Sequence, residues 1–502
     1  MKEFVNLFFS FLLGVLFPLP LPLFARGMVP SDAPNGAQRL MMERGYGMFV
    51  HFGMNTFIEQ EWSEGKVPAL TYAPDDLDCD QWVRVARDAG FRYVLLVTKH
   101  HDGFCLWDSQ YTEYDVASSG NKTDVVGAVA RACKKYGLEF GIYYSLWDRH
   151  EPTYTCGDFT KYVDFMCGQL TELMTNYGDI CELWLDGAWD KPAAEWNIPR
   201  LYDLVKNINP NCAVGVNGTI GTSEEDQGGF VEVLPDRMTE DNIFHMRYFP
   251  GDFRLWDPMI ASRNDKKQYL YGGNSYYLPF EHTICLSKEW AWFQKRDIKY
   301  VRDLDELEEL FYWTTCNGNS LVVNIAPDYH GRIREHEAQT AIALCKRLGI
   351  RRGEPLLSGG RYLQVGCPTE ATSCWDSSDE FAPDKASDGG LQTRWASADL
   401  TPQLVVTLAP HTEFDKITIF EYCDVEHLGD FSNRRTNRIQ AYTIDRFVDG
   451  CWETIFADDT PMGDCKTIRF PYFYSAEKVR LNVRSATAPP SIYEFNVINT
   501  SL

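Results

Sequence analysis

The sequence has few positive charges for its size. Its 48 lysines and arginines face 71 aspartates and glutamates, which gives a formal net charge of -23 over 502 residues. Nucleic acids and anionic membranes are bound by cationic surfaces, because the protein must neutralise phosphate groups. A short basic run, "NRRTNR" at Asn433–Arg438, does not reverse this balance. The composition therefore argues against nucleic acid or an anionic membrane as a partner.

Several motifs that accompany metal or cofactor chemistry are absent. The 15 cysteines form no CxxC pair and no Cys/His spacing of a zinc site, and because their number is odd at least one stays unpaired. There is no HxH or HExxH for a catalytic metal and no GxSxG for a serine hydrolase. No GxGxxG follows the first predicted strand. We therefore expect neither a metal nor an organic cofactor, and we assign no disulfide.

The one long apolar run lies at the N-terminus. It covers residues 4–24, follows Lys2, and ends beside Ala25. Three prolines within it would interrupt a membrane-spanning helix, and the arrangement is that of a secretory signal peptide over residues 1–26. The run contains no cysteine for a lipid anchor. We therefore expect an exported protein, periplasmic or extracellular, whose mature chain has no membrane span.

Between residues 39 and 348, apolar strands alternate with amphipathic helices. The strand "GYGMFVHFG" is followed by the helix "DQWVRVARDAG" and the strand "FRYVLLVT", and the alternation continues to "SLVVNIA" and a last helix. Such a pattern predicts parallel strands joined by helical crossovers. We expect an α/β fold, a (β/α)8-like TIM barrel forming a catalytic domain over residues 32–350, with a doubly wound sheet as the alternative. The irregular stretch Thr219–Tyr277 predicts long loops over the active face and leaves strands six and seven uncertain.

The pattern changes after residue 350. Residues 351–366 predict a linker, because they are rich in glycine and contain a proline. From residue 367 to 502, runs of period two such as "QLVVTLA", "KITIFEY" and "KVRLNVR" are separated by turn residues. This second pattern predicts an antiparallel β-sandwich.

Polar residues stand where four of the predicted barrel strands end. In a barrel of this kind the functional residues cluster at the C-terminal ends of the strands, so we expect these side chains to converge on one pocket. The aromatic content of 14% suits a pocket that stacks flat apolar faces such as sugar rings. The residues are His51 in "FVHFG", His100 and His101 in "TKHHDGF", Tyr143 (or its neighbour Tyr144) in "GIYYS", and Asp186 in "LWLDGAW".

Asp186 carries the most chemical information of this set. Gly187 beside it permits the close approach of a ligand, and Trp189 offers a stacking face. A carboxylate in such a place can attack the anomeric carbon of a sugar, although an aspartate there can also cap the next helix. The adjacent His100 and His101 point to opposite sides of an extended chain, which makes a shared metal ion awkward.

Together these motifs resemble the retaining α-L-fucosidases of glycoside hydrolase family 29. The resemblance covers about residues 45–348 and rests on "FVHFGMNTF", "TKHHDGFCLWDS", "GIYYS", "ELWLDGAW" and "NGNSLVVNIAPDYHGRI" in this order. It implies that Asp186 is the catalytic nucleophile. It also implies sugar-binding residues: His51, His100, His101 and Tyr143 hold fucose hydroxyls, and Glu61, Trp62 and Trp189 line the pocket.

The resemblance leaves the general acid/base open. "YLPFEHTICLSKEWAWF" is similar to a family segment that carries an acidic residue, which makes Glu281 the first choice. The alternatives are Glu224, Glu225 and Asp252, because some members place the acid in the loop after strand five.

The resemblance implies a retaining exo-α-L-fucosidase that removes terminal α-L-fucose from a fucosylated oligosaccharide or glycoconjugate by double displacement. Two alternatives stay open: a retaining glycosidase for a similar sugar such as α-L-galactose, and a non-catalytic, lectin-like protein that binds fucose. The carboxylate of Asp186 favours an enzyme over a lectin.

In the C-terminal part, "PDKASDGGLQTRWASA" at Pro383–Ala398 resembles the discoidin or coagulation-factor type C family. The resemblance implies a β-sandwich and a carbohydrate-binding module. A structural calcium site, or a packing domain without sugar affinity, are the alternatives.

Overall fold

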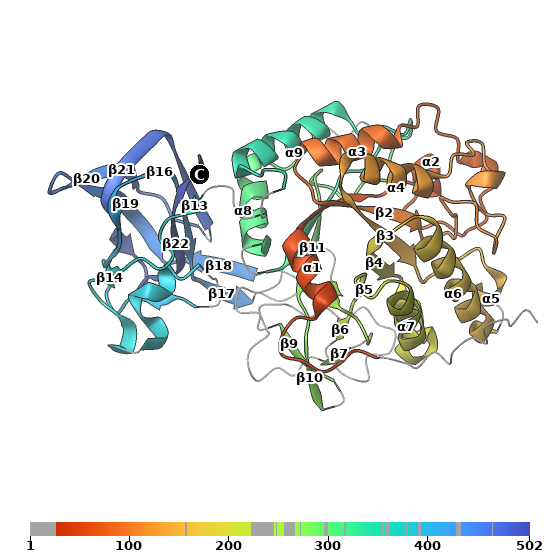
Figure 1. Cartoon of the computed structure of the whole chain (residues 1–502), viewed down its shortest axis with the longest axis horizontal. Coiled ribbons are helices and arrows are strands. Elements are labelled where there is room, and N and C mark those ends of the chain that lie inside the picture. Colours follow the sequence, from red (N-terminus) through yellow and green to blue (C-terminus); the bar gives the residue numbers. More distant parts are fainter. Residues whose placement is uncertain are drawn as a thin grey trace, which may run out of the picture.

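The structure of the chain is a computed structural model (Figure 1). Residues 1–26, for which a signal peptide is predicted, lie outside the residues that it describes, so that prediction is not tested. The described residues are 27–155, 158–221, 245–246, 248–255, 267–271, 273–295, 300–315, 318–353, 356, 361–377, 379–389, 393–427, 433–463 and 465–501.

Eight parallel strands close into a barrel, with the neighbour order β1-β12-β11-β8-β5-β4-β3-β2 (Figure 1). Because β1 pairs with both β2 and β12, the sheet has no edge. The predicted TIM barrel is confirmed, and the doubly wound sheet is wrong. The strands are β1 (Tyr46–Val50), β2 (Tyr93–Lys99), β3 (Glu139–Ser145), β4 (Ile180–Asp186), β5 (Ala213–Asn217), β8 (Phe253–Leu255), β11 (Phe280–Cys285) and β12 (Ser320–Asn324).

Helices surround the barrel and bury their apolar faces against it (Figure 1). Their ends follow the local sequence: α4 begins where the Asp124 side chain accepts a hydrogen bond from Gly127 N at 2.8 Å, and ends at Gly137 with a φ of 67°. The helices are α1 (Gly36–Arg44), α2 (Met54–Ile58), α3 (Cys79–Asp88), α4 (Val125–Tyr136), α5 (Pro152–Thr155), α6 (Phe159–Asn176), α7 (Ile198–Ile208), α8 (Leu304–Thr315) and α9 (Glu335–Leu348).

The irregular stretch between residues 219 and 277 contains one short barrel strand. This strand, β8, has only three residues, and β11 follows directly after the stretch. The described residues between β5 and β11 contain no α-helix, so the pattern of alternating strands and helices fails there. The short strands of this stretch are β6 (Ile220–Gly221), β7 (His245–Met246), β9 (Gln268–Tyr271) and β10 (Asn274–Tyr277).

The C-terminal part forms an antiparallel β-domain, as predicted. Hydrogen bonds join its main strands into one eight-stranded sheet, in which β16 and β21 run through the whole domain. Register shifts interrupt the β16–β21 pairing at residues 407–412 and 414–416. The strands are β13 (Arg361–Tyr362), β14 (Thr369–Ala371), β15 (Trp395–Ala396), β16 (Gln403–Glu421), β17 (Cys423–His427), β18 (Asn433–Asn437), β19 (Ile439–Val448), β20 (Cys451–Asp458), β21 (Cys465–Ala486) and β22 (Ser491–Asn499).

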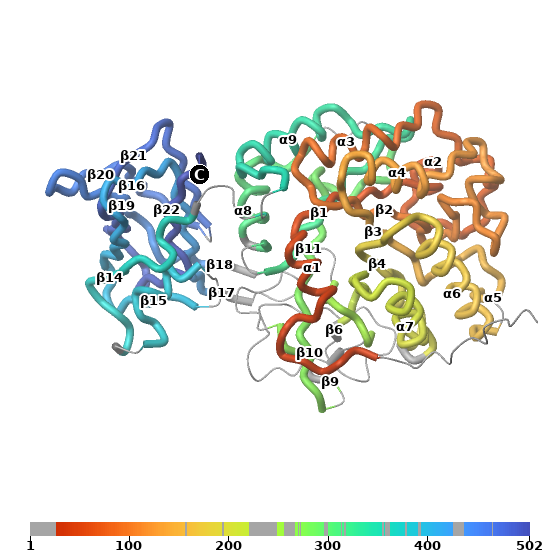
Figure 2. Tube along the Cα trace, in the orientation of Figure 1, coloured from red at the N-terminus to blue at the C-terminus, as the bar shows by residue number. Residues whose placement is uncertain are grey.

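The β-domain packs beside α8 of the barrel (Figures 1 and 2). Phe420 lies 6.4 Å from the ring of Tyr312 and belongs to the same buried apolar cluster as the barrel helices. At the interface Glu308 of α8 is 1% exposed at its side chain and contacts Lys416 at 3.4 Å, together with Arg469. The two domains therefore share a buried interface with both apolar and ionic contacts.

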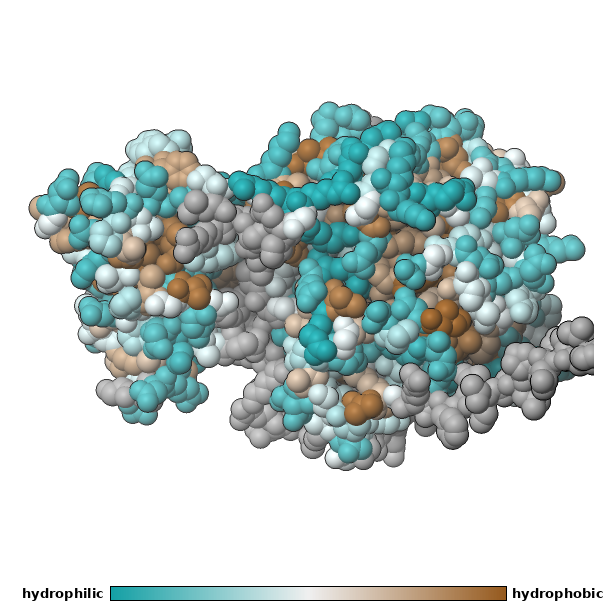
Figure 3. Space-filling view, viewed as in Figure 1, coloured by the Kyte–Doolittle hydropathy of each residue, from teal (hydrophilic) through white to brown (hydrophobic). Residues whose placement is uncertain are grey.

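The view in Figure 3 shows a largely hydrophilic surface on both domains, in keeping with the high content of charged residues. Among the described residues every cysteine carries a free thiol. The same residues include no helix with the length and apolar character needed to span a membrane.

Candidate active site

The carboxyl group of Asp186 lies at the C-terminal end of β4. Its Oδ2 accepts a hydrogen bond from the Tyr143 hydroxyl at 2.7 Å, and its Oδ1 accepts one from Asn217 Nδ2 at 3.0 Å. These donors come from β3 and β5, the two strands that flank β4. Burial raises the pKa of Asp186, and the two hydrogen bonds oppose that rise because they stabilise the carboxylate. Both carboxylate oxygens are thereby held in fixed directions at the rim of the barrel.

His101 faces Asp186 as a neutral imidazole. Its Nε2 lies 3.6 Å from Asp186 Oδ2, and its Nδ1 lies 2.6 Å from the Ser145 hydroxyl oxygen. Because Ser145 donates its own proton to the Trp147 carbonyl at 2.6 Å, it accepts the proton of His101 Nδ1. Burial lowers the pKa of His101 to about 3, so the ring stays uncharged. Nε2 is therefore left as an acceptor for a ligand hydroxyl.

His51 repeats this arrangement, and His100 adds a third buried imidazole. His51 Nδ1 lies 3.1 Å from Asn324 Oδ1, an acceptor, so its Nε2 is also left as an acceptor. His100 Nδ1 is buried without a hydrogen-bond partner, which is unusual for a polar atom and suits a place that a ligand completes. Burial lowers the pKa of His51 to about 3 and that of His100 well below its ordinary value. Three uncharged imidazoles thus border one space.

Tryptophan rings form one wall of this space. Trp62 is 50% exposed, and its ring centre lies 6.1 Å from His101, 5.7 Å from Trp147 and 6.3 Å from Trp189. Trp189 also lies 5.6 Å from His101. Because Trp62 is half open to solvent, it stands at the mouth of the pocket, whereas Trp147 lies deeper. Flat apolar faces beside hydroxyl acceptors are what a sugar ring needs.

Two further tryptophans lie beside His51, and one of them contacts Glu61. Trp290 donates from Nε1 to Glu61 Oε1 at 2.6 Å, and the ring centres of Trp290 and Trp292 lie 5.1 Å and 5.0 Å from His51. Burial raises the pKa of Glu61, and the charge of Asp186 adds to the rise, while the Trp290 hydrogen bond opposes it. Glu61 is thus near enough to Asp186 for the two charges to interact.

Tyr143 and Tyr144 point to opposite faces of β3. The Tyr143 hydroxyl reaches Asp186, as described above. The Tyr144 hydroxyl instead lies 2.9 Å from Lys99 Nζ and donates to Gln169 of α6, so it faces the helix layer. Of the two residues in "GIYYS", the structure therefore brings Tyr143 into the pocket.

The structure does not bring Glu281 together with Asp186. Glu281 is the second residue of β11, is fully buried, and accepts hydrogen bonds from Trp184 Nε1 at 2.9 Å and from the Tyr93 hydroxyl at 3.3 Å. Tyr93 begins β2, and Trp184 lies two residues before Asp186 on β4, so Glu281 lies in a deeper layer of the barrel. Burial and the neighbouring Glu182 raise the pKa of Glu281 well above its ordinary value. Its position does not support a role as the acid/base.

Two of the three alternatives for the acid/base, Glu224 and Glu225, lie outside the described residues. The third, Asp252, directly precedes β8, is fully buried and forms an ion pair with Lys206 at 2.5 Å. Asp252 also accepts hydrogen bonds from the Tyr202 hydroxyl and from Val214 N. It therefore joins elements at the N-terminal end of the barrel, away from Asp186.

Besides Trp147, three polar site residues were missed from the sequence: Ser145, Asn217 and Asn324. Each is the last residue of its barrel strand, β3, β5 or β12. The signal that could have found them is the one that found Asp186, a polar residue that ends an apolar strand. Within the described ranges, no three His, Cys, Asp or Glu side chains are grouped so that they could hold a metal ion.

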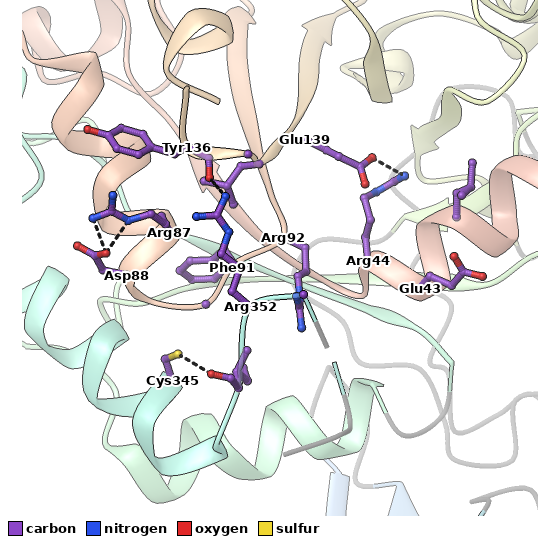
Figure 4. Close-up of a pocket in the computed structure, with 16 residues that line it drawn as sticks. Glu43, Arg44, Arg87, Asp88, Phe91, Arg92, Tyr136, Glu139, Cys345 and Arg352 are labelled. Atoms are coloured by element: carbon purple, nitrogen blue, oxygen red, sulfur yellow. Dashed lines mark hydrogen bonds and ion pairs between the residues drawn. The ribbon is translucent and has the colours of Figure 1, made fainter. Parts of the chain in front are cut away.

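A separate cavity of about 700 Å³ lies at the N-terminal end of the barrel (Figure 4). Its walls include the residues just before β2, the start of β3 and the linker at Arg352, and several of its charged side chains have partners. Arg44 pairs with Glu139 at 3.2 Å, and Arg352 donates to the Tyr136 carbonyl. In a barrel of this kind the N-terminal face serves stability rather than chemistry, so this cavity is not part of the candidate site.

Comparisons with known proteins agree with this geometry. The family model described as alpha-L-fucosidase matches residues 37–350. Alpha-L-fucosidase 1 of Arabidopsis thaliana is 28% identical over 95% of this chain and 88% of its own length, and a putative alpha-L-fucosidase 1 of Oryza sativa is 28% identical over 98% and 91%. The crystal structure of a putative alpha-L-fucosidase from Bacteroides thetaiotaomicron has a TM-score of 0.56 at 26% identity, and covers 94% of this chain and 99% of that one.

Proposed function

Because the chain belongs to the alpha-L-fucosidase family, we propose that it removes terminal α-L-fucose from fucosylated oligosaccharides or glycoconjugates with net retention. The observation that carries the proposal is the carboxylate of Asp186, which Tyr143 and Asn217 orient at the open end of the barrel. A fixed carboxylate beside neutral hydroxyl acceptors suits attack on an anomeric carbon.

Asp186 acts as the nucleophile. It attacks the anomeric carbon and forms a glycosyl-enzyme intermediate, while a second carboxyl group protonates the leaving oxygen. The same second group then removes a proton from water, which attacks the intermediate from the side that the leaving group vacated. In retaining enzymes the two carboxyl groups lie about 5–5.5 Å apart.

We propose that the second carboxyl group is not that of Glu281, because this side chain is hydrogen-bonded to Trp184 in the barrel interior. We propose that it comes from the segment that follows β5. Asn217, the last residue of β5, already contacts Asp186, so the chain leaves the barrel beside the nucleophile. Glu224 and Glu225 are the residues of that segment that the sequence predicts, and they are the first to test.

The neutral imidazoles and the tryptophans hold the sugar. His51 and His101 accept hydroxyl protons at Nε2, and His100 offers its unpartnered Nδ1. Trp62 and Trp189 cover one face of the ring at the mouth of the pocket. The C5 methyl group of fucose needs an apolar contact, which the buried ring of Trp292 supplies.

The proposal is tested with purified protein and an aryl α-L-fucoside. Wild type releases the phenol, Asp186→Gly does not, and added azide restores release by Asp186→Gly through attack at the vacated position. Fucose binding without release by wild type would indicate the lectin-like alternative. A preference for the aryl α-L-galactoside would indicate the related glycosidase.

We also propose that the protein is exported, on the basis of the signal-peptide pattern at residues 1–26. Expression of the full chain with its own N-terminus, followed by N-terminal sequencing of the mature protein, tests this proposal. A mature chain that begins close after Ala25 is the expected result. A chain that retains Met1 in the cell would contradict it.

A further inference from the structure

A buried ion pair lies directly behind the two site histidines. Lys99 ends β2 immediately before His100, and its side chain is fully buried. Its Nζ lies 2.9 Å from Asp148 Oδ2, 2.9 Å from the Tyr144 hydroxyl and 3.2 Å from Gln169 Oε1. An ammonium group has three donors, and all three have acceptors here. The charge is therefore fully paired, but it contacts neither Asp186 nor the sugar pocket.

A bulge in β2 turns Lys99 away from the pocket. Val97 pairs with Tyr143, but Lys99 pairs with the next residue, Tyr144, so β2 holds one extra residue at this point. Thr98 uses its hydroxyl to bond the Tyr143 carbonyl at 2.7 Å. After the bulge Lys99 faces the helix layer, while His100 faces the barrel interior, 5.8 Å from the Tyr143 ring. The bulge thus couples the direction of Lys99 to that of the histidines.

Asp148 connects the loop that contains Trp147 to the ammonium group of Lys99. Its Oδ2 contacts Lys99, and its Oδ1 accepts hydrogen bonds from His150 N at 3.0 Å and Glu151 N at 2.9 Å. The residue before it is Trp147, whose ring centre lies 5.1 Å from that of His101. Asp148 therefore fixes the loop that carries one tryptophan of the pocket.

The histidine turn and the Trp147 loop also touch through their backbones. Arg149 N donates to the His101 carbonyl at 3.0 Å. Gly103 closes the histidine turn with a φ of +85°, and a Cβ there would lie 2.3 Å from Asp148 Oδ1. The two loops are therefore packed so closely that the ion pair joins them at their base.

Stability alone does not explain such a pair. Two charges removed from water lose hydration that their attraction only partly returns, and apolar replacements of buried pairs are often neutral or stabilising. We propose that Lys99 and Asp148 are positioning residues, which hold His101 and Trp147 in the geometry that binds the sugar ring. This inference rests on the proposed function, because it assigns a task to residues behind the same pocket.

The test compares Lys99→Met with wild type on an aryl α-L-fucoside, at a temperature where circular dichroism shows both folded. We expect KM and the inhibition constant of free fucose to rise together, with a loss of about 10- to 100-fold in kcat/KM, because small displacements of positioning groups have effects of this size. The pH profile of kcat should keep its shape, because neither residue exchanges protons with the substrate.

Two further variants keep the inference testable if Lys99→Met does not fold. Asp148→Asn keeps the volume but removes the charge, and its NH2 group must face either Lys99 Nζ or the N–H groups of His150 and Glu151. It should therefore raise the same two constants. Tyr144→Phe removes a single acceptor of Lys99 Nζ and should raise them by a smaller factor. A folded Asp148→Asn or Lys99→Met enzyme with wild-type KM and fucose inhibition constant would overturn the inference.

Lys206→Met provides a matched control. Lys206 also forms a close, mostly buried pair with Asp252, at 2.5 Å against 2.9 Å for Lys99 and Asp148, but at the N-terminal end of the barrel. This variant should lose stability and keep wild-type KM and fucose inhibition constant per folded molecule. If it raised both constants as Lys99→Met does, the effect would be one of general stability, and the positioning role would be wrong. If wild type itself releases no phenol, the proposed function fails, independently of the variants.

Discussion

Asp186 and Glu281 are both buried carboxyl groups inside the barrel, and each accepts one hydrogen bond from a tyrosine hydroxyl and one from a side-chain N–H. They differ in their place along a strand. Asp186 ends β4, where 7% of the residue is exposed to a pocket of imidazoles, whereas Glu281 stands near the start of β11 and is fully buried next to Glu182. Similar hydrogen bonds therefore orient the proposed nucleophile at one end of the barrel and an interior carboxyl group nearer the other end.

The largest expected effect separates these two carboxyl groups directly. Asp186→Asn should lower kcat on an aryl α-L-fucoside by about 10⁴-fold, because the nucleophile is lost while the pocket keeps its shape. Glu281→Gln should keep kcat within about threefold, because the amide replaces a group that does not meet the substrate. Steady-state kinetics on both purified variants is the measurement. A loss of 10³-fold or more for Glu281→Gln would contradict the view that Glu281 does not meet the substrate.

A third buried carboxylate, Glu308, extends the comparison to the domain interface. It differs from the other two because cations pair with it: Arg347 at 2.6 Å and Lys416 at 3.4 Å, together with Arg469. Glu308→Gln should lower the free energy of unfolding by about 3 kcal/mol, because it leaves the buried ammonium group of Lys416 without its anion. Urea unfolding measures the change.

The neighbouring Glu306→Gln is the control for that prediction, since Glu306 is partly exposed and pairs with Arg302 on the helix surface. It should change the free energy of unfolding by about 0.5 kcal/mol or less. Equal losses for both variants would show that the cation cluster contributes no more than a surface pair.

The two tyrosines offer a smaller and closely matched test. Tyr143→Phe removes the hydrogen bond to Asp186, and Tyr93→Phe removes the one to Glu281. A hydrogen bond to a charged group contributes about 1.5–3 kcal/mol, so Tyr143→Phe should lower kcat/KM by about 10- to 100-fold. Tyr93→Phe should affect stability and leave kcat/KM within about threefold. Equal catalytic losses in the two variants would contradict the difference between the two ends.

The smallest expected effect concerns pH. Burial raises the folded-state pKa of Glu281 above its ordinary value of 4.5. Such a group contributes stability that is complete below the pKa of the unfolded chain and is lost as the pH rises through the folded-state pKa. Wild type should therefore lose stability as the pH rises above 4.5, and Glu281→Gln should lose less over the same range. Unfolding curves at several pH values test this, and parallel pH dependences would contradict it.

The sequence predicts the open end of the barrel well and its interior poorly. His51, His101 and Asp186 could be found because each ends a run of apolar residues, and the ends of parallel strands meet at one face of a barrel. The barrel itself follows from the repeated strand–helix pattern. The prediction fails where the pattern stops, since β8 has three residues and no helix among the described residues separates it from β11.

The position of Glu281, away from Asp186, could not be predicted from the sequence, for a physical reason. A motif shows which residues are adjacent, but not whether a residue lies at the start or the end of its strand. Glu281 follows Phe280 at the start of β11, and this distinction places it in a deeper layer. The direction of the Lys99 side chain could not be predicted for a similar reason. A bulge in the β2–β3 pairing sets that direction, and no residue pattern marks the bulge.

In the proposed mechanism, Asp186 forms the covalent bond to the sugar. Its most direct test is to incubate wild type with a 2-deoxy-2-fluoro-fucosyl fluoride, which forms the glycosyl-enzyme intermediate but hydrolyses it slowly, and to map the labelled peptide by mass spectrometry. We expect one added fluorofucosyl group on the peptide that contains Asp186, and none on Asp186→Asn. A label on another carboxyl group, such as Glu281 or Glu61, would contradict it.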